Sequence, residues 1–330
     1  MNGDMKSITI STKENGRKEF KLQGPWIPTD IASYDNIPTG DMPGDKVKIS
    51  EEHIRKAQLI VPELLKQLIP HLNEHPNQKA VIAVCGGSGV GKSEIASLLS
   101  YYLNQMELGS YTLSGDNYPH RVPSYNDAER MRIFRTSGIK GLIIHGLYSE
   151  ETKRVLLELQ NSDNDYNPEY TKAYSWLAIY QSTGRDGLKN YLGTANEIDF
   201  HELSDIISRF KNGSDHIHLK RMGRTVTELW YESVDFSNTN ILIIEWTHGN
   251  SYHLQGVDLP ILLNSTPKET LEHRRARNRD GGTDSPFTTM VLGIEQELLI
   301  SQAIRAKLII SKNGELLTYQ DYTKIMSQES

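Results

Sequence analysis

The segment Gly86–Ser93 reads GGSGVGKS and satisfies every fixed position of the pattern G-x-x-x-x-G-K-[ST]. It follows the apolar run Ala80–Cys85, which is typical of a buried parallel strand, and it precedes a stretch expected to be helical from Ser93 to Asn104. Glycines let successive backbone N–H groups point inward at phosphate oxygens, and the following helix offers its positive N-terminal end. The pattern therefore predicts an α/β domain that binds a nucleoside triphosphate.

Within this loop the side chains have distinct expected roles. Lys92 should reach the β- and γ-phosphates, and Ser93 should supply a hydroxyl ligand to Mg²⁺. The predicted nucleotide-binding residues are Gly86, Gly87, Ser88, Gly89, Val90, Gly91, Lys92, Ser93 and Glu94.

Composition limits the remaining classes. The chain has 330 residues, of which 37% are hydrophobic and 24% charged, as in an ordinary globular protein. A net charge of −6 disfavours a general nucleic-acid binder, so no nucleic-acid partner is expected. A single cysteine, Cys85, excludes an internal disulfide framework. The chain has no apolar run of about 18 residues and no signal-peptide core, so we expect no membrane partner and a cytoplasmic location.

The position of the phosphate loop in the sequence predicts an N-terminal elaboration over residues 1–75 and a nucleotide-binding domain over 76–330. A β-hairpin is expected around Asn15-Gly16, followed by a loop rich in proline and glycine and a helix from about 50 to 71 that Pro62 kinks or divides. Trp26 and Tyr34 in the loop could stack on a ligand or pin the loop to the domain.

Three further strands are predicted with polar residues at their ends, and a fourth closes the chain. They are 110–114, ending before Asp116; 241–244, ending at Glu245; 259–263; and 307–311. In an open parallel sheet the ligand lies beyond the carboxyl ends of the strands. Asp116 is therefore a candidate to accept a substrate proton or to hold Mg²⁺, although an Asp-Asn turn is an alternative. Ser93, Asp116 and Glu245 form the predicted metal site.

A basic segment follows the 259–263 strand. Thr266-Pro267-Lys268-Glu269 has the form of a helix start with a capping box, and the expected helix carries four arginines: Arg274, Arg275, Arg277 and Arg279. They could clamp phosphates as a mobile lid over about 267–285, or form a solvated basic face. Asp116, Lys92, Arg274 and Arg277 are the predicted catalytic residues.

The order of these parts resembles the uridine kinase, phosphoribulokinase and pantothenate kinase group of P-loop kinases over most of 80–311. Gly115-Asp116-Asn117-Tyr118 is similar to the group's strand-end motif, whose Asp is the base, and Glu245 falls where the group has a strand-end Glu. The resemblance implies a three-layer α/β/α P-loop NTPase fold with a mostly parallel sheet. It also implies transfer of the ATP γ-phosphate to a hydroxyl of a small molecule, with Mg²⁺.

Two features depart from that group. An extra segment at about 136–194 is expected to be a helical insert that rebuilds acceptor recognition, and Glu245 is followed by Trp246-Thr247-His248. The stretch 115–121 is also similar to adenylylsulfate kinases, which leaves that substrate class open. The predicted acceptor-binding residues are Tyr118, His120, Arg121, Trp246 and His248.

Other basic residues are weaker candidates. Arg130, Arg132 and Arg135 could reach an anionic acceptor, whereas Lys220, Arg221 and Arg224 form a patch that could contact substrate or be a solvated loop.

Three functions stay open beside a small-molecule kinase. They are a regulatory nucleotide-binding module without phosphotransfer, an adenylylsulfate kinase-like enzyme and a kinase of another acceptor class. A GTPase is disfavoured, because no N-K-x-D follows the loop and Asp41-Met42-Pro43-Gly44, a D-x-x-G match, precedes it. Self-association is left open.

Overall fold

The computed structural model describes residues 8–14, 16–31, 33, 37–277 and 285–328. The chain divides into two compact units, which are described separately below. The first comprises residues 1–118, 200–266 and 299–330, and the second comprises 119–199 and 267–298. The domain boundaries expected from the sequence stay a prediction.

A six-stranded sheet forms the centre of the first unit, in the order β10-β9-β8-β3-β7-β4. Its strands are β3 (Ala80–Gly86), β4 (Ser110–Ser114), β7 (Ile241–Glu245), β8 (Leu259–Leu263), β9 (Leu308–Ile310) and β10 (Leu316–Leu317). All neighbours pair in parallel except β9 and β10. The five predicted parallel strands are thus confirmed, and the carboxyl ends of β3, β7 and β4 lie at one edge.

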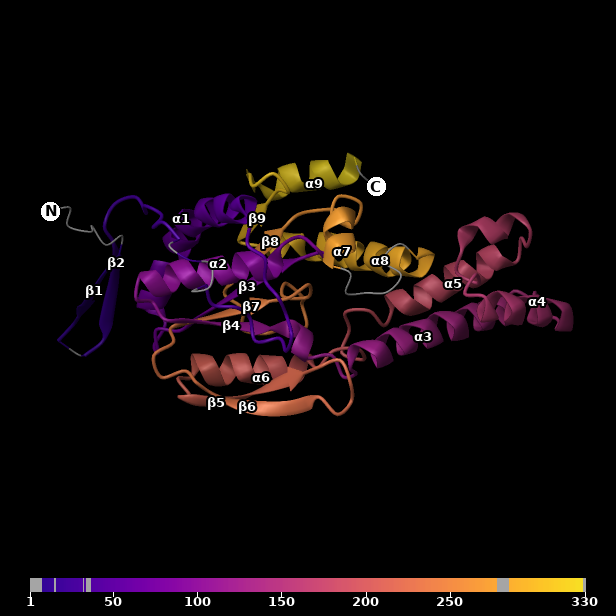
Figure 1. Cartoon of the computed structure of the whole chain (residues 1–330), viewed down its shortest axis with the longest axis horizontal. Coiled ribbons are helices and arrows are strands. Elements are labelled where there is room, and N and C mark those ends of the chain that lie inside the picture. Colours follow the sequence, from indigo (N-terminus) through magenta and orange to yellow (C-terminus); the bar gives the residue numbers. More distant parts are fainter. Residues whose placement is uncertain (1–7, 15, 32, 34–36, 278–284, 329–330) are drawn as a thin grey trace. The chain divides into compact units, whose positions relative to one another are not determined.

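Helices cover both faces of this sheet, which confirms the three-layer prediction. Helices α1 (Glu51–Glu74) and α2 (Lys92–Gln105) pack against one face through the largest apolar cluster. Helix α9 (Tyr319–Gln328) shares a second cluster with Cys85, Leu262 and Ile309, whose side chains alternate to the other face. Helix α6 (Phe200–Lys211) is drawn on the side of β3 and β7 opposite to α2 (Figure 1).

The N-terminal hairpin consists of β1 (Ile8–Thr12) and β2 (Lys18–Leu22). It is joined to the end of α1, where the Asn73 amide bonds both backbone groups of Phe20 at 3.0 and 2.8 Å. A division of α1 at Pro62 is wrong, because the helix continues through it. Its buried apolar face offsets the hydrogen bond that proline removes.

Of the two aromatic residues singled out in the N-terminal loop, the structure describes Trp26. The Trp26 ring meets Tyr102 edge-on at 5.1 Å, which favours its packing role. Tyr34 lies outside the described residues. A second hairpin, formed by β5 (His216–Met222) and β6 (Leu229–Asp235), was not expected from the sequence.

The second unit is helical, as predicted for the insert. Its helices are α3 (Pro123–Ile144), α4 (Glu150–Asn161), α5 (Leu177–Lys189), α7 (Leu271–Arg277) and most of α8 (Pro286–Gln302). Helices α3 and α5 approach closely at glycines: a Cβ on Gly138 would lie 2.6 Å from the Tyr180 ring, and one on Gly184 would lie 2.7 Å from Phe134. The predicted helix start at Thr266-Pro267 is wrong, because 267–270 form turns before α7 begins.

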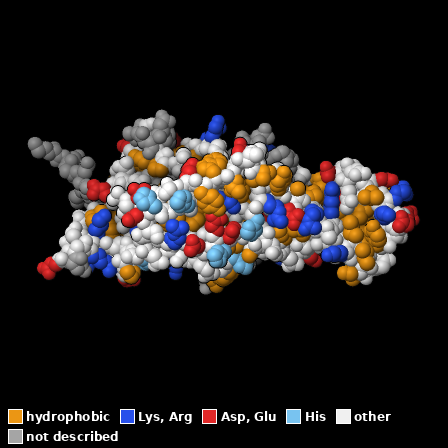
Figure 2. Space-filling view, turned by 90° about the horizontal axis from the view of Figure 1, so that it is seen from below, with side chains coloured by type: hydrophobic (Ala, Val, Ile, Leu, Met, Phe, Trp, Pro, Cys, Tyr) orange, Lys and Arg blue, Asp and Glu red, His pale blue; other side chains and the backbone are white. Residues whose placement is uncertain are grey.

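Among the described residues, no helix is long and apolar enough to cross a membrane. On the face drawn in Figure 2, the described acidic and basic side chains are interspersed.

Candidate active site

The phosphate loop joins the end of β3 to the start of α2. Gly86 has a φ of +149°, and a Cβ there would lie 2.5 Å from the carbonyl oxygen of Leu263, so glycine is required for the approach to β8. Gly89 and Gly91 also have positive φ values, of 80° and 93°. Because α2 begins at Lys92, its unpaired N–H groups adjoin the loop and favour an anion there.

The two polar side chains that follow the glycines have defined partners. The Lys92 Nζ donates a hydrogen bond of 3.0 Å to the Gly87 carbonyl oxygen, so the ammonium group lies across the loop. The Ser93 hydroxyl donates to Glu245 Oε2 at 3.0 Å. Glu94 has a buried side chain in α2, and its contact with nucleotide stays a prediction.

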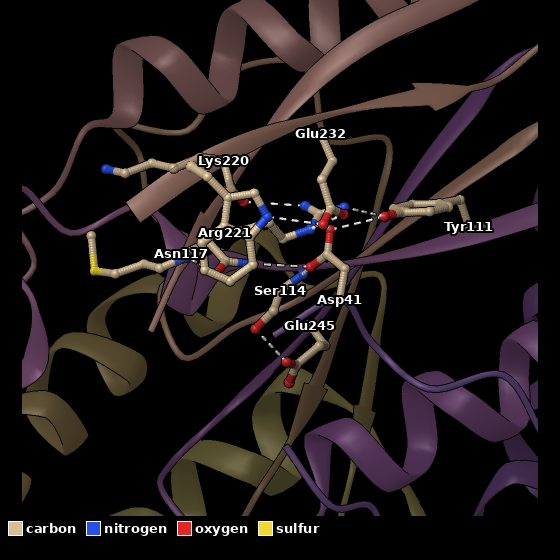
Figure 3. Close-up of polar contacts among 10 residues, drawn as sticks. Asp41, Tyr111, Ser114, Asn117, Lys220, Arg221, Glu232 and Glu245 are labelled. Atoms are coloured by element: carbon tan, nitrogen blue, oxygen red, sulfur yellow. Dashed lines mark hydrogen bonds and ion pairs between the residues drawn. The ribbon is translucent and has the colours of Figure 1, made fainter. Parts of the chain in front are cut away.

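Glu245 is buried at the end of β7, between β3 and β4. Its second oxygen accepts a hydrogen bond of 2.6 Å from the Ser114 hydroxyl (Figure 3). Burial, and then the negative charge of Asp116, raise the pKa of Glu245 to about 7, against the opposing effect of Ser114, Lys92 and Ser93. A divalent cation would favour the ionised form of such a carboxylate.

Asp116 lies in a short 3₁₀ turn, Gly115–Asn117, that directly follows β4. Its side chain is exposed, yet close enough to Glu245 for the two charges to interact. The structure therefore brings Lys92, Ser93 and Asp116 to the same sheet edge as Glu245. Hydroxyl and carboxylate oxygens are the ligands that Mg²⁺ prefers, so Ser93, Asp116 and Glu245 fit the ion.

Trp246 lies beneath the turn that carries Asp116. A Cβ on Gly115 would lie 2.1 Å from the indole Cγ of Trp246, so the ring supports the turn directly. Trp246 is 2% exposed, and the buried His248 meets its ring at 5.2 Å. The roles of both residues in acceptor binding stay predictions.

The other predicted acceptor-binding residues belong to different units. Tyr118 is buried in the first unit, and burial raises the pKa of its hydroxyl. His120 and Arg121 belong to the second unit, where His120 Nε2 lies 3.0 Å from the Ala195 carbonyl and Arg121 donates to the Tyr191 hydroxyl at 3.0 Å.

The arginines of the second unit are largely engaged within it. Arg130 pairs with the buried Glu197 at 2.7 Å, and Arg135 pairs with the buried Asp165 at 2.9 Å. Arg274 donates to the Pro267 carbonyl at 2.7 Å. The side chain of Arg277, and Arg279 as a whole, lie outside the described residues, so the arginine lid stays a prediction.

For Arg221 the sequence left a substrate contact and a solvated loop open, and the structure excludes the solvated loop. Arg221 is not part of a solvated patch: it is a buried residue of β5 that pairs with Asp41 at 2.9 Å. In the sequence, Asp41 is notable only as the first residue of the D-x-x-G match that precedes the phosphate loop. His53, at the start of α1, is also near the loop, since its Nε2 would lie 3.0 Å from a Cβ on Gly91.

A phosphate loop after the central strand, with a neighbouring strand-end carboxylate, defines a P-loop nucleotide-binding protein of the α/β class. Comparison with known proteins adds a kinase relative. The chain is 38% identical over 238 residues to the bifunctional alpha-galactosidase/sucrose kinase AgaSK of Mediterraneibacter gnavus. The match covers 72% of this chain, and the chain spans about a fifth (20%) of that relative. The resemblance to small-molecule kinases is thereby confirmed. No protein-family profile matches the chain.

Solved structures of small-molecule kinases show weaker likeness. D-glycerate 3-kinase from Cryptococcus neoformans has a TM-score of 0.45 at 12% identity, covering 79% of this chain and 97% of its own. Phosphoribulokinase from Rhodobacter spheroides has a TM-score of 0.43 at 11% identity, covering 71% and 70%. Similarity at this level does not define a substrate.

Proposed function

We propose that this chain is an ATP-dependent kinase that transfers the γ-phosphate of ATP to a hydroxyl group of a sugar, with sucrose as the first acceptor to test. The observation that carries the proposal is the cluster at the edge of the sheet: the phosphate-loop Ser93 bonded to Glu245, with the exposed Asp116 beside them. The sugar class is supported by the 38% identity to a protein named as a sucrose kinase.

The chemistry follows from these groups. The acceptor oxygen forms a bond to the γ-phosphorus, the bond to the β–γ bridging oxygen breaks, and ADP leaves with its electron pair. The Asp116 carboxylate accepts the proton of the acceptor hydroxyl. Lys92 and the N-terminal N–H groups of α2 hold the β- and γ-phosphates and stabilise their charge.

Mg²⁺ would be held by Ser93 and Glu245, with Asp116 as the third predicted oxygen ligand. When bound, the ion neutralises charge on the phosphate oxygens. The raised pKa of Glu245 fits a carboxylate whose ionised form a cation would stabilise.

The test is ADP release with ATP and Mg²⁺ across sucrose, monosaccharides, glycerate, nucleosides and adenylylsulfate. Asp116→Asn should lower kcat by about 10²- to 10⁴-fold while nucleotide affinity changes little, because the amide cannot accept the proton but keeps an oxygen that can bind Mg²⁺. Asp205→Asn, an exposed carboxylate on α6, is the matched control. Tight ATP binding without turnover on any acceptor would instead establish a regulatory module, and release with another acceptor would replace the sugar class.

A further inference from the structure

Asp116 is flanked on both sides by residues that bond to one carboxylate from the N-terminal loop. The backbone N–H of Ser114 donates to Asp41 Oδ1 at 2.7 Å, and the Asn117 amide donates to the same oxygen at 3.2 Å (Figure 3). Asp41 therefore holds the turn that presents Asp116 at both its first and its last residue.

The other oxygen of Asp41 is held just as closely. It accepts hydrogen bonds from Arg221 Nη1 at 2.9 Å and from the Tyr111 hydroxyl at 3.0 Å. Arg221 in turn bonds Tyr111 at 2.9 Å and pairs with Glu232 at 3.0 Å. The side chains of Arg221 and Asp41 are 5% and 8% exposed, so water competes little for these bonds.

Two more contacts join this network to the site. The backbone N–H of Met222, which follows Arg221 in β5, donates a hydrogen bond of 2.9 Å to the side-chain oxygen (Oδ1) of Asn117. Gly40, next to Asp41, lies beside Glu245: a Cβ there would be 3.8 Å from Glu245 Oε1. The N-terminal loop thus contacts both strand ends that carry the acidic residues.

We propose that Asp41, held by Arg221, is a positioning residue that fixes the Ser114–Asn117 turn and with it the direction of the Asp116 side chain. This inference rests on the proposed function, in which Asp116 takes the acceptor proton. Since a displacement of about 1 Å at a reacting group can cost about 100-fold in rate, a loosened turn should lower kcat more than it affects binding.

The test compares Asp41→Ala with a matched variant, Asp258→Ala. Asp258 also accepts a backbone N–H, that of Val81 at 2.9 Å, and also pairs with a cation, Lys211 at 2.6 Å. Val81 lies at the start of β3, so this pair is at the opposite end of the strand from the phosphate loop. The two substitutions therefore remove the same chemistry at different distances from Asp116.

Asp41→Ala should lower kcat by about 30- to 100-fold with the KM for ATP within about twofold, and Asp258→Ala should leave both nearly unchanged. Asp41→Asn, which keeps an oxygen for the Ser114 N–H, should restore most of the loss. Because Asp41→Ala leaves a buried cation unpaired, Asp41→Ala/Arg221→Met should recover the melting temperature without recovering kcat. Recovery of kcat together with the melting temperature would overturn the proposal, since the role would then be stability alone.

Hydrogen–deuterium exchange separates this inference from the proposed function. In Asp41→Ala the amides of 114–118 should exchange at least about tenfold faster than in the wild type, while those of β3 do not change. Unchanged exchange at 114–118 would refute the positioning role of Asp41, even if the enzyme were active. If exchange there is faster but the protein phosphorylates no acceptor, Asp41 still holds the turn and the proposed kinase function is rejected.

Discussion

Ser93 and Glu245 are separated by 152 residues along the chain, yet the Ser93 hydroxyl donates a hydrogen bond of 3.0 Å to the Glu245 carboxylate. The contact joins the phosphate loop to the end of the neighbouring strand. It places two of the three predicted Mg²⁺ ligands within direct reach of each other. Burial beside Asp116 raises the pKa of Glu245 to about 7, so this carboxyl group changes its charge near neutral pH.

The pH dependence of stability should therefore report on Glu245. Its folded-state pKa of about 7 lies above the ordinary value of 4.5, so the folded protein binds the proton more tightly than the unfolded chain. This contribution to the free energy of unfolding is full below about pH 4.5 and declines by up to about 3 kcal/mol as the pH rises through 7.

Glu245→Gln removes that decline. In urea unfolding with EDTA and without nucleotide, the variant should gain stability relative to the wild type between about pH 5 and pH 8. Glu151→Gln, an exposed residue of α4, should show no such gain. A constant difference between Glu245→Gln and the wild type at both pH values would contradict the assignment.

Lys92→Ala should weaken nucleotide binding. The ammonium group lies across the phosphate loop, 3.0 Å from the Gly87 carbonyl, where it can bond phosphate oxygens. Loss of one charge-assisted interaction of about 1.5–3 kcal/mol corresponds to about a 10- to 100-fold rise in Kd. Titration with a fluorescent ATP analogue measures the Kd, and Lys66→Ala on α1 is the control. Equal affinities for the two variants would exclude a role of Lys92 in nucleotide binding.

Gly86→Ala should destabilise the protein, whereas Gly293→Ala should not. A Cβ at Gly86 meets the Leu263 carbonyl at 2.5 Å on a backbone with φ +149°, so we expect a loss of about 2–3 kcal/mol. Gly293 lies within α8 with no atom within 4 Å of a Cβ, and alanine there should stabilise by about 0.5–1 kcal/mol. Chemical unfolding of both variants is the measurement, and opposite signs are the expected result.

Cys85 should resist alkylation in the folded protein. Burial raises the pKa of its thiol to about 12, so little thiolate forms near neutral pH. Iodoacetamide at about pH 8 should label the chain only after denaturation, as judged by intact mass. Rapid labelling of the native protein would show that the second apolar cluster opens readily.

The parts that could be predicted from the sequence depend on neighbours along the chain. The run before Gly86 and the GKS at its end define β3, the loop and α2 locally, and the apolar runs ending at Ser114 and Glu245 define the adjacent strands. Parallel pairing then brings the strand ends together by a general rule.

What could not be predicted depends on distant pairs. The basic residues around Arg221 predicted either a substrate contact or a solvated loop, but Arg221 is buried and pairs with Asp41, 180 residues away. The packing of Trp246 under the Asp116 turn depends on the missing side chain of Gly115, which lies far away in the sequence, and the contact of Trp246 with the acceptor stays a prediction. Nothing in a single sequence indicates either partner.

The Asp41 contacts also bear on how much of the chain is needed for function. A fragment beginning at residue 76 would retain the complete phosphate-loop motif, all six strands of the sheet and Asp116, and a motif search would rate it as intact. It would nevertheless lack Asp41 and Gly40, and with them the bonds that hold the Ser114–Asn117 turn. The smallest unit that a motif recognises is thus smaller than the unit that can hold its catalytic groups in place.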